Sequence, residues 1–271
     1  MRIAQLSDMH FVALGERLYD SVDVNACNAD IIHQLNHLID PLDAIVVSGD
    51  ITNDGTAEQY QAAAKILGYA RYPLYLINGN HDKTESFIEY LAPLCAPLES
   101  AAQVRYQVDM GKRQLLFIDS TVPGQTYGQL SQSTLDWVAE QLAQTRLPVA
   151  IFMHHPPLAL NSAHMDPINC RNGTKLLDFA EEFPHLEGIY CGHNHCYTTT
   201  VYRNVVVMSA PATSIQIPVY QHDATPYYQF DQPSCLLHSL SGDNRWVSYQ
   251  HHFQLFQGVR RFPWVNGTGG K

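Results

Sequence analysis

Aspartate, asparagine and histidine residues directly follow several short apolar runs of this chain. They stand in five groups: Asp8-Met9-His10, Gly49-Asp50, Gly79-Asn80-His81-Asp82, His154-His155-Pro156-Pro157 and Gly192-His193-Asn194-His195. Carboxylate, amide and imidazole groups bind Fe, Mn, Zn or Co in open catalytic sites, whereas structural zinc sites mostly use thiolates. If these groups were gathered without a cation, each unpaired one would cost several kcal/mol. Seven such side chains, one of them shared, would give each of two metals four donors. The pattern therefore predicts a dinuclear metal centre.

The last group lies between Cys191 and Cys196, which raises the alternative of a local zinc motif. The six cysteines of the chain have no repeated CxxC spacing, and reduced, mostly buried thiols are expected in a chain of this size. We therefore assign the metal to His193 and His195. The two cysteines are expected to pack behind the turn.

Short buried strands are the elements that must position these groups, and seven apolar runs have the right length and composition. They are Ile3–Ser7, Ala44–Ser48, Leu74–Asn78, Leu115–Asp119, Val149–Met153, Gly188–Cys191 and Val205–Ser209. Helical patterns occupy Val24–Ile39, Ala57–Tyr69, Lys83–Leu91, Gln132–Ala143 and Thr174–Phe183. A hairpin is expected from Val104–Asp109 and Arg113–Asp119. This alternation predicts an α/β protein, in which ligands collect at the carboxyl ends of strands.

We expect one domain over residues 1–271, with a catalytic core at about 1–217. From about Pro218 the sequence becomes aromatic and polar and loses its helical period. Residues 218–260 are expected to form a C-terminal β-hairpin that acts as a cap or an oligomerisation arm, so we expect a homo-oligomer. Residues 261–271 are expected to be a tail without a function.

The charge of the chain limits its partners. It has 26 acidic residues against 16 Lys and Arg, a net charge of −10, and no basic run. A nucleic-acid polymer is not an expected partner, because phosphate neutralisation needs clustered cations. No run of 18 apolar residues occurs, so no membrane association is expected. The first residues lack the apolar stretch of a secretion signal, and we expect a cytoplasmic protein.

The five groups, in this order, resemble the motifs of the calcineurin-like metallophosphoesterase superfamily. They stand as "DMH" at 8, "GDITN" at 49, "GNHD" at 79, "MHHPP" at 153 and "GHNH" at 192. Through "LYDSVDVNACNADIIHQLN", "IFMHHPPLAL", "MDPINCRNG" and "WVSYQHH", the chain is most similar to the bacterial branch of glycerophosphodiesterases and class III cyclic-nucleotide phosphodiesterases. This resemblance runs to about His252 and implies a four-layer αββα sandwich.

The resemblance also implies seven metal ligands. One metal would be held by Asp8, His10 and His195, the other by Asn80, His154 and His193, with Asp50 bridging the two. The family pattern His-x-Pro selects His154, and His155 remains the alternative. The expected cofactors are two divalent or trivalent ions of Fe, Mn, Zn or Co.

The activity implied is hydrolysis of small phosphodiesters, such as glycerophosphodiesters or cyclic nucleotides, by in-line attack of a metal-bound hydroxide. A phosphomonoesterase or nucleotide pyrophosphatase on the same site is the alternative. Together with Asn80 and Asp50, His81 forms the expected catalytic set, and it would touch the phosphate or protonate the leaving group. Asp82 would either orient a ligand histidine or cap a helix.

Substrate selection is expected from two loops at the same rim, Phe11–Asp23 and Pro156–Asn172. Their candidate residues are Arg17, Tyr19, Asn161, His164 and Asp166. Close relatives often have one more histidine in the pocket, at a position where this chain has Ile215, so one substrate contact is in question. His33 and His37 are four residues apart but lack the Glu of a zincin motif, so a solvated helix face is expected.

Overall fold

The computed structural model describes residues 1–95 and 104–253. The predicted tail, 261–271, and the end of the predicted C-terminal segment, 254–260, lie outside these ranges.

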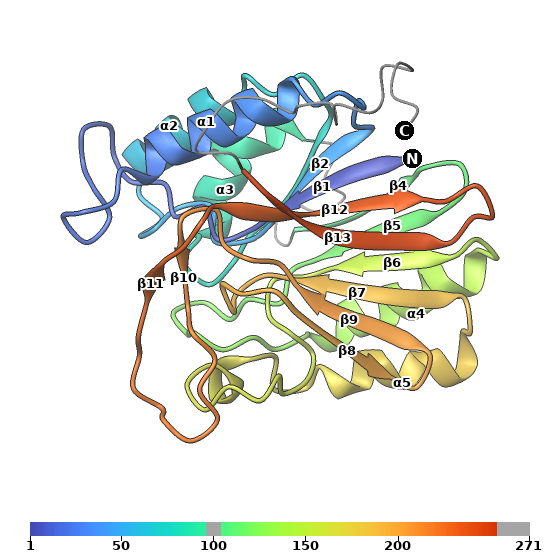
Figure 1. Ribbon diagram of the computed structural model, residues 1–271. Helices are drawn as coiled ribbons and strands as arrows, with labels where there is room; N and C mark the ends of the chain where they lie inside the picture. Colours follow the sequence, from blue (N-terminus) through green and yellow to red (C-terminus); the bar gives the residue numbers. More distant parts are fainter. Residues whose placement is uncertain (96–103, 254–271) are drawn as a thin grey trace, which may run out of the picture.

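Two sheets packed face to face form the centre of the molecule (Figure 1). The five-stranded sheet has the order β13-β12-β1-β2-β3 and consists of β1 (Arg2–Leu6), β2 (Ala44–Ser48), β3 (Leu74–Ile77), β12 (Ser234–Leu240) and β13 (Trp246–His252). The six-stranded sheet has the order β4-β5-β6-β7-β9-β8 and consists of β4 (Arg105–Asp109), β5 (Gln114–Ile118), β6 (Val149–Phe152), β7 (Leu186–Cys191), β8 (Thr198–Tyr202) and β9 (Val205–Ser209). β1 to β3 run parallel to one another, as do β5, β6, β7 and β9.

Helices cover the outer face of each sheet, which completes the four layers (Figure 1). The first sheet is covered by α1 (Val24–Asn36), α2 (Ala57–Leu67) and α3 (Thr84–Leu91), the second by α4 (Gln132–Gln144) and α5 (Thr174–Glu182). Asp23, Thr56 and Ser131 begin α1, α2 and α4, since each side chain accepts a hydrogen bond from a first-turn N–H. The four-layer αββα sandwich implied by the family resemblance is confirmed.

The core follows from the alternation of side chains along the strands. Phe117, Phe152 and Tyr190 project between the sheets from β5, β6 and β7, and their rings stack with centroids 5.2 and 5.3 Å apart. Their strand neighbours Leu116 and Ile151 pack on the opposite face, against α4 and α5. Because both faces of these strands are buried, they appear in the sequence as continuous apolar runs.

The predicted strands are present, and β2 and β9 match their predicted bounds residue for residue. β8 was not among the predicted strands. It is an edge strand with alternately exposed side chains and three threonines in a row. That strand lacks the continuous apolar run by which its buried neighbours were recognised. α1 ends at Asn36, three residues before the predicted end.

The segment beyond Pro218 contains two different parts. The predicted hairpin is present as β12 and β13, and β12 pairs antiparallel with β1, from Arg2↔Ser239 to Gln5↔Leu236. The hairpin is therefore part of the five-stranded sheet rather than a detached arm. Before it, β10 (Ile215–Gln216) and β11 (Gln229–Phe230) pair with each other, and the chain between them forms a long loop beside the sandwich (Figure 1).

Over residues 1–95 and 104–253, no helix has both the length and the apolar character needed to span a membrane.

Candidate metal centre

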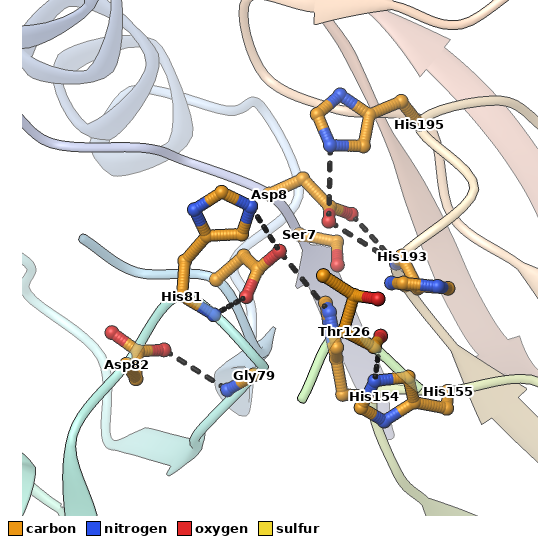
Figure 2. A network of polar contacts seen from close by, with 12 residues as sticks. Ser7, Asp8, Gly79, His81, Asp82, Thr126, His154, His155, His193 and His195 are labelled. Atoms are coloured by element: carbon orange, nitrogen blue, oxygen red, sulfur yellow. Dashed lines mark hydrogen bonds and ion pairs between the residues drawn. The ribbon is translucent and has the colours of Figure 1, made fainter. Parts of the chain in front are cut away.

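The five predicted groups of polar residues meet at one edge of the sandwich. They follow β1, β2, β3, β6 and β7, whose carboxyl ends lie at this edge. Figure 2 shows Asp8, His154, His193 and His195 facing a common centre, although they come from both sheets. Residues 187 positions apart in the chain, Asp8 and His195, approach to 3.4 Å between Oδ1 and Nε2.

Four of the predicted ligands form one compact set: Asp8, His10, Asp50 and His195. All are buried, and their ligand atoms lie within 4.8 Å of one another. The Nε2 atoms of His10 and His195 are 3.1 Å apart, and His10 Nε2 is 3.9 Å from Asp50 Oδ2. Two carboxylates and two imidazoles at these distances form a site suited to a divalent cation.

The remaining predicted ligands are Asn80, His154 and His193. His154 Nε2 is 3.2 Å from Asp50 Oδ2, and the rings of His154 and His193 are 5.1 Å apart. Asn80 Oδ1 and His193 Nε2 are buried atoms that have no hydrogen-bond partner among the described residues. Unpaired buried polar atoms are rare and need an explanation, and a cation held between them would provide one. The residues present therefore fit a second metal.

Strained turns hold several of these side chains. Asp8, His10, Asp50, His193 and His195 all have a positive φ, between 47° and 68°. For residues other than glycine such a conformation costs of order 1–3 kcal/mol, and it clusters at functional sites. Ten non-glycine residues of the described chain have a positive φ, and five of them are predicted ligands.

Backbone carbonyl groups orient three histidines. His154 Nδ1 bonds the Ser48 carbonyl at 2.8 Å, and His195 Nδ1 bonds the Ile215 carbonyl at 3.0 Å. His81 Nδ1 bonds the Asn53 carbonyl at 2.6 Å. Since a carbonyl only accepts, each Nδ1 carries a proton, and each Nε2 is the ring nitrogen directed into the site. The sequence contains no signal for these contacts, because every residue has a carbonyl.

The neighbouring His155 is engaged at both ring nitrogens. Ser120 Oγ bonds its Nδ1 at 2.9 Å, and the Thr126 carbonyl bonds its Nε2 at 3.2 Å. A metal could bind this ring only after one of these bonds was broken. His155 lies close to the site, since its ligand atom is within 4.8 Å of those of His154 and His193. Its two occupied nitrogens nevertheless favour His154 as the ligand.

Burial and charge set the protonation of the histidines. Burial, reinforced by neighbouring imidazoles, holds the pKa of His10 and of His193 well below the usual value. Both rings are thus neutral near pH 7, the form that binds metals. Burial also lowers the pKa of His154, but Asp50 outweighs this effect and raises it to about 9. Asp50 is an anionic centre that favours positive charge at its Oδ2.

His81 and Asp82 leave the same turn in different directions (Figure 2). His81 is partly exposed, and its Nε2 lies 4.0 Å from Asp50 Oδ2. Asp82 has neither of its predicted roles. Its carboxylate accepts from the backbone N–H groups of Ile51, Thr52 and Gly79 and contacts no ligand histidine. The N-cap of α3 is Lys83, without a side-chain bond.

The structure also locates the residues that were expected to select substrate. Ile215 is buried against Val12, Leu18 and Val24, so its side chain anchors the Phe11–Asp23 loop. In the second loop, Asp166 accepts from the N–H groups of Leu160 and Ser162, a structural use.

Of the other candidates, Tyr19 packs against Tyr228 with tilted rings whose centroids are 4.8 Å apart, and Arg17 Nη1 donates to the Ser21 carbonyl. Asn161 adopts a positive φ, and His164 is partly buried. His33 and His37 pack against each other with tilted rings at the end of α1 and belong to neither group of potential metal ligands.

Comparisons with known proteins agree with this geometry. Residues 1–197 match the family model described as calcineurin-like phosphoesterase. The chain is 48% identical to "Glycerophosphodiester phosphodiesterase GpdQ" of Enterobacter lignolyticus, over 98% of this chain and 94% of the relative. It is 28% identical to "3',5'-cyclic adenosine monophosphate phosphodiesterase CpdA" of Haemophilus influenzae, over 80% of this chain and 77% of the relative.

The fold is similar to the crystal structure of a dimetal phosphatase from Danio rerio, with a TM-score of 0.66 and 13% identity, covering 88% of this chain and 95% of the other. The full-length similarity to the first relative and the family match over the five motif groups lead to one conclusion. The chain belongs to the calcineurin-like phosphoesterase family.

Proposed function

We propose that this chain is a metal-dependent phosphodiesterase that hydrolyses small diesters, of the glycerophosphodiester or cyclic-nucleotide type. The observation that carries this proposal is the presence of two neighbouring ligand sets. The first is formed by Asp8, His10, Asp50 and His195, whose ligand atoms lie within 4.8 Å of one another. The second has three buried atoms without a hydrogen-bond partner among the described residues, Asn80 Oδ1, His154 Nε2 and His193 Nε2. When bound, a metal pair ligates the phosphoryl oxygens and supplies the nucleophile.

The ligand assignment follows the two sets. Asp8, His10 and His195 hold one ion, Asn80, His154 and His193 hold the other, and Asp50 lies between them. The donors are oxygen and nitrogen, which Fe, Mn, Zn and Co all accept, so availability selects the ion.

His81 is the residue that contacts the substrate. Its Nδ1–H is committed to the Asn53 carbonyl, which directs Nε2 toward the centre, 4.0 Å from Asp50 Oδ2. Burial lowers the pKa of His81, but Asp50 outweighs this effect and the pKa is raised. A ring that retains its proton at Nε2 is suited to contact the phosphate or to protonate the departing alkoxide.

The test of the function is a substrate panel. The chain is reconstituted with Mn, Co, Zn or Fe and assayed with bis(p-nitrophenyl) phosphate, p-nitrophenyl phosphate, a glycerophosphodiester, cyclic AMP and a dinucleoside pyrophosphate. We expect the highest kcat/KM with a diester. A strong preference for the monoester or for the pyrophosphate would assign the site to the alternative activities and refute the proposal.

The role of His81 has its own test. The variant His81→Ala is expected to bind both metals and to lose about 10²–10⁴-fold in turnover with a glycerophosphodiester. The loss should be smaller with bis(p-nitrophenyl) phosphate, because p-nitrophenolate leaves without a proton. Unchanged turnover with both substrates would contradict the assigned role.

We treat residues 1–271 as one domain, because β12 completes the sheet of β1. We place the protein in the cytoplasm, where reduced cysteines are the norm, since none of the six cysteines, all of which lie within the described residues, forms a disulfide. We also propose a homo-oligomer formed through the exposed aromatic side chains of the β10–β11 loop, such as Tyr220 and Tyr227. Light scattering on the purified chain measures the oligomeric state, and a monomer would refute this last statement.

A further inference from the structure

The carboxylate of Asp82 collects five hydrogen bonds, more than an aspartate needs for a simple turn. Its Oδ1 accepts from Thr52 N at 3.0 Å, from Thr52 Oγ1 at 2.9 Å and from the Tyr60 hydroxyl at 3.1 Å. Its Oδ2 accepts from the backbone N–H groups of Ile51 and Gly79, both at 3.0 Å. Every donor except Tyr60 belongs to a turn that carries a predicted metal ligand.

These contacts join two turns that come from different strands. Ile51 and Thr52 follow Asp50 at the end of β2, and Gly79 precedes Asn80 at the end of β3. The cross-link is reciprocal, because Asp50 Oδ1 accepts from the His81 N–H at 2.9 Å. Each turn therefore supplies an aspartate that captures backbone N–H groups of the other.

The reciprocal bonds bring the turns into very close contact. A Cβ atom at Gly79 would lie 2.2 Å from Asp50 Oδ1, so only glycine fits there. Asp50 itself has φ 48°, a conformation that needs outside support. With Oδ1 bound to the His81 N–H, Oδ2 is the oxygen that faces His10, His81 and His154, at 3.9, 4.0 and 3.2 Å.

Tyr60 anchors the cross-link to a rigid element. Its hydroxyl donates to Asp82 and accepts from the Lys83 N–H at 2.9 Å. Tyr60 belongs to α2, and its ring is fully buried in the apolar core. The two metal-binding turns are thus fixed to each other and to a helix through one carboxylate.

We propose that Asp82, supported by Tyr60, is a positioning residue for the dinuclear centre: it sets the separation between the Asp50 carboxylate and the Asn80 amide. It contacts neither metal nor substrate and acts through the backbone of the two turns. The inference rests on the ligand assignment of the proposed function. Outer partners of this kind typically change metal affinity about 10- to 100-fold when they are replaced.

The test compares four full-length chains: wild type, Asp82→Asn, Tyr60→Phe and Val138→Ala. Asparagine keeps the size of Asp82 but places an NH₂ group against backbone donors, whichever way its amide is turned. Tyr60→Phe removes one donor and is the variant that decides the question if Asp82→Asn does not fold. Val138→Ala creates a small cavity in α4, far from both turns, and controls for a general loss of stability.

Each chain is titrated with Mn²⁺ by calorimetry, and EPR spectra are recorded at one and two equivalents. We expect wild type and Val138→Ala to bind two ions and to give a spin-coupled spectrum. For Asp82→Asn we expect the second ion to bind at least tenfold more weakly, with separate six-line signals. Tyr60→Phe should shift the second affinity in the same direction by a smaller factor.

The outcomes separate the two proposals. Asp82→Asn and Tyr60→Phe could both bind the second Mn²⁺ ion with wild-type affinity and show the wild-type spin coupling. This result would overturn the positioning role of Asp82 and leave the proposed function standing. The same weakening in Val138→Ala would also overturn the positioning role, because the effect would then follow stability. A wild-type chain that binds fewer than two ions would overturn the proposed function, and this inference with it.

Discussion

His238 provides a quantitative test of the packing between the two sheets. It lies in β12, fully buried, with its ring stacked on Trp246 at 5.3 Å. Its Nε2–H donates to Gln5 Oε1 at 3.0 Å, and its Nδ1 accepts from the Ser248 hydroxyl at 2.7 Å. Burial lowers the pKa of His238 to about 3. The folded protein therefore holds this imidazole neutral across the acidic range.

The sign of the effect follows from proton binding. Between pH values of about 3 and 6.5 the unfolded chain takes up a proton that the folded chain excludes, so stability is complete above pH 6.5 and falls as the pH is lowered. At about 1.4 kcal/mol per pH unit, lowering the pH from 6.5 to 5 costs roughly 2 kcal/mol from this residue. For a chain of 271 residues, this corresponds to a decrease in Tm of about 3–4 °C.

The assay is thermal unfolding followed by circular dichroism at pH 5, 6, 7 and 8, for wild type and His238→Gln. The variant is less stable at pH 7, and its Tm should fall by about 3–4 °C less than that of wild type between pH 7 and pH 5. His33→Gln, on the exposed face of α1, is the matched control and should keep the wild-type slope. A wild-type slope in His238→Gln would refute the account of a neutral buried imidazole.

Three further outcomes are expected. Gly49→Ala would place a Cβ atom 2.3 Å from His154 Nδ1. We therefore expect weaker Mn²⁺ binding by calorimetry and a kcat lower by at least about tenfold. Wild-type values of both quantities would contradict the close approach of Gly49 to His154. Phe152→Ala removes the middle ring of the stack with Phe117 and Tyr190. The free energy of unfolding, measured in urea, should fall by about 3–5 kcal/mol. A decrease of less than about 1 kcal/mol would argue against this packing. Removal of metal with a chelator should abolish activity and lower Tm, and both should return with Mn²⁺; full activity in the chelated protein would exclude a metal-dependent reaction.

Most of the fold could be predicted because its central strands are buried on both faces. Their continuous apolar runs, such as Ala44–Ser48 and Val205–Ser209, stand out from any other pattern in the chain. The edge strand β8 has no such run and was missed. The C-terminal hairpin was predicted from its own sequence, but its pairing with β1 was not, since that contact joins residues more than 230 positions apart, such as Gln5 and Leu236.

The sequence by itself determined the chemistry of this protein. Asp, Asn and His at five strand ends, with glycine before three of them, were enough to predict a dinuclear metal site and a family, because few other roles require those residue types together. They also favoured the imidazoles over the thiols in "CGHNHC". Of the two cysteines expected to pack behind the turn, Cys191 is fully buried and Cys196 is partly buried.

Only the tertiary structure decided how the site is held. The carbonyl groups of Ser48, Asn53 and Ile215 orient three imidazoles, and Asp82 joins the Asp50 turn to Gly79. A backbone carbonyl or N–H is present at every position, so its use depends on which turns the fold brings together. The types of the candidate ligand residues can thus be read from the sequence, whereas the positions of their side chains depend on backbone contacts between segments far apart in the chain.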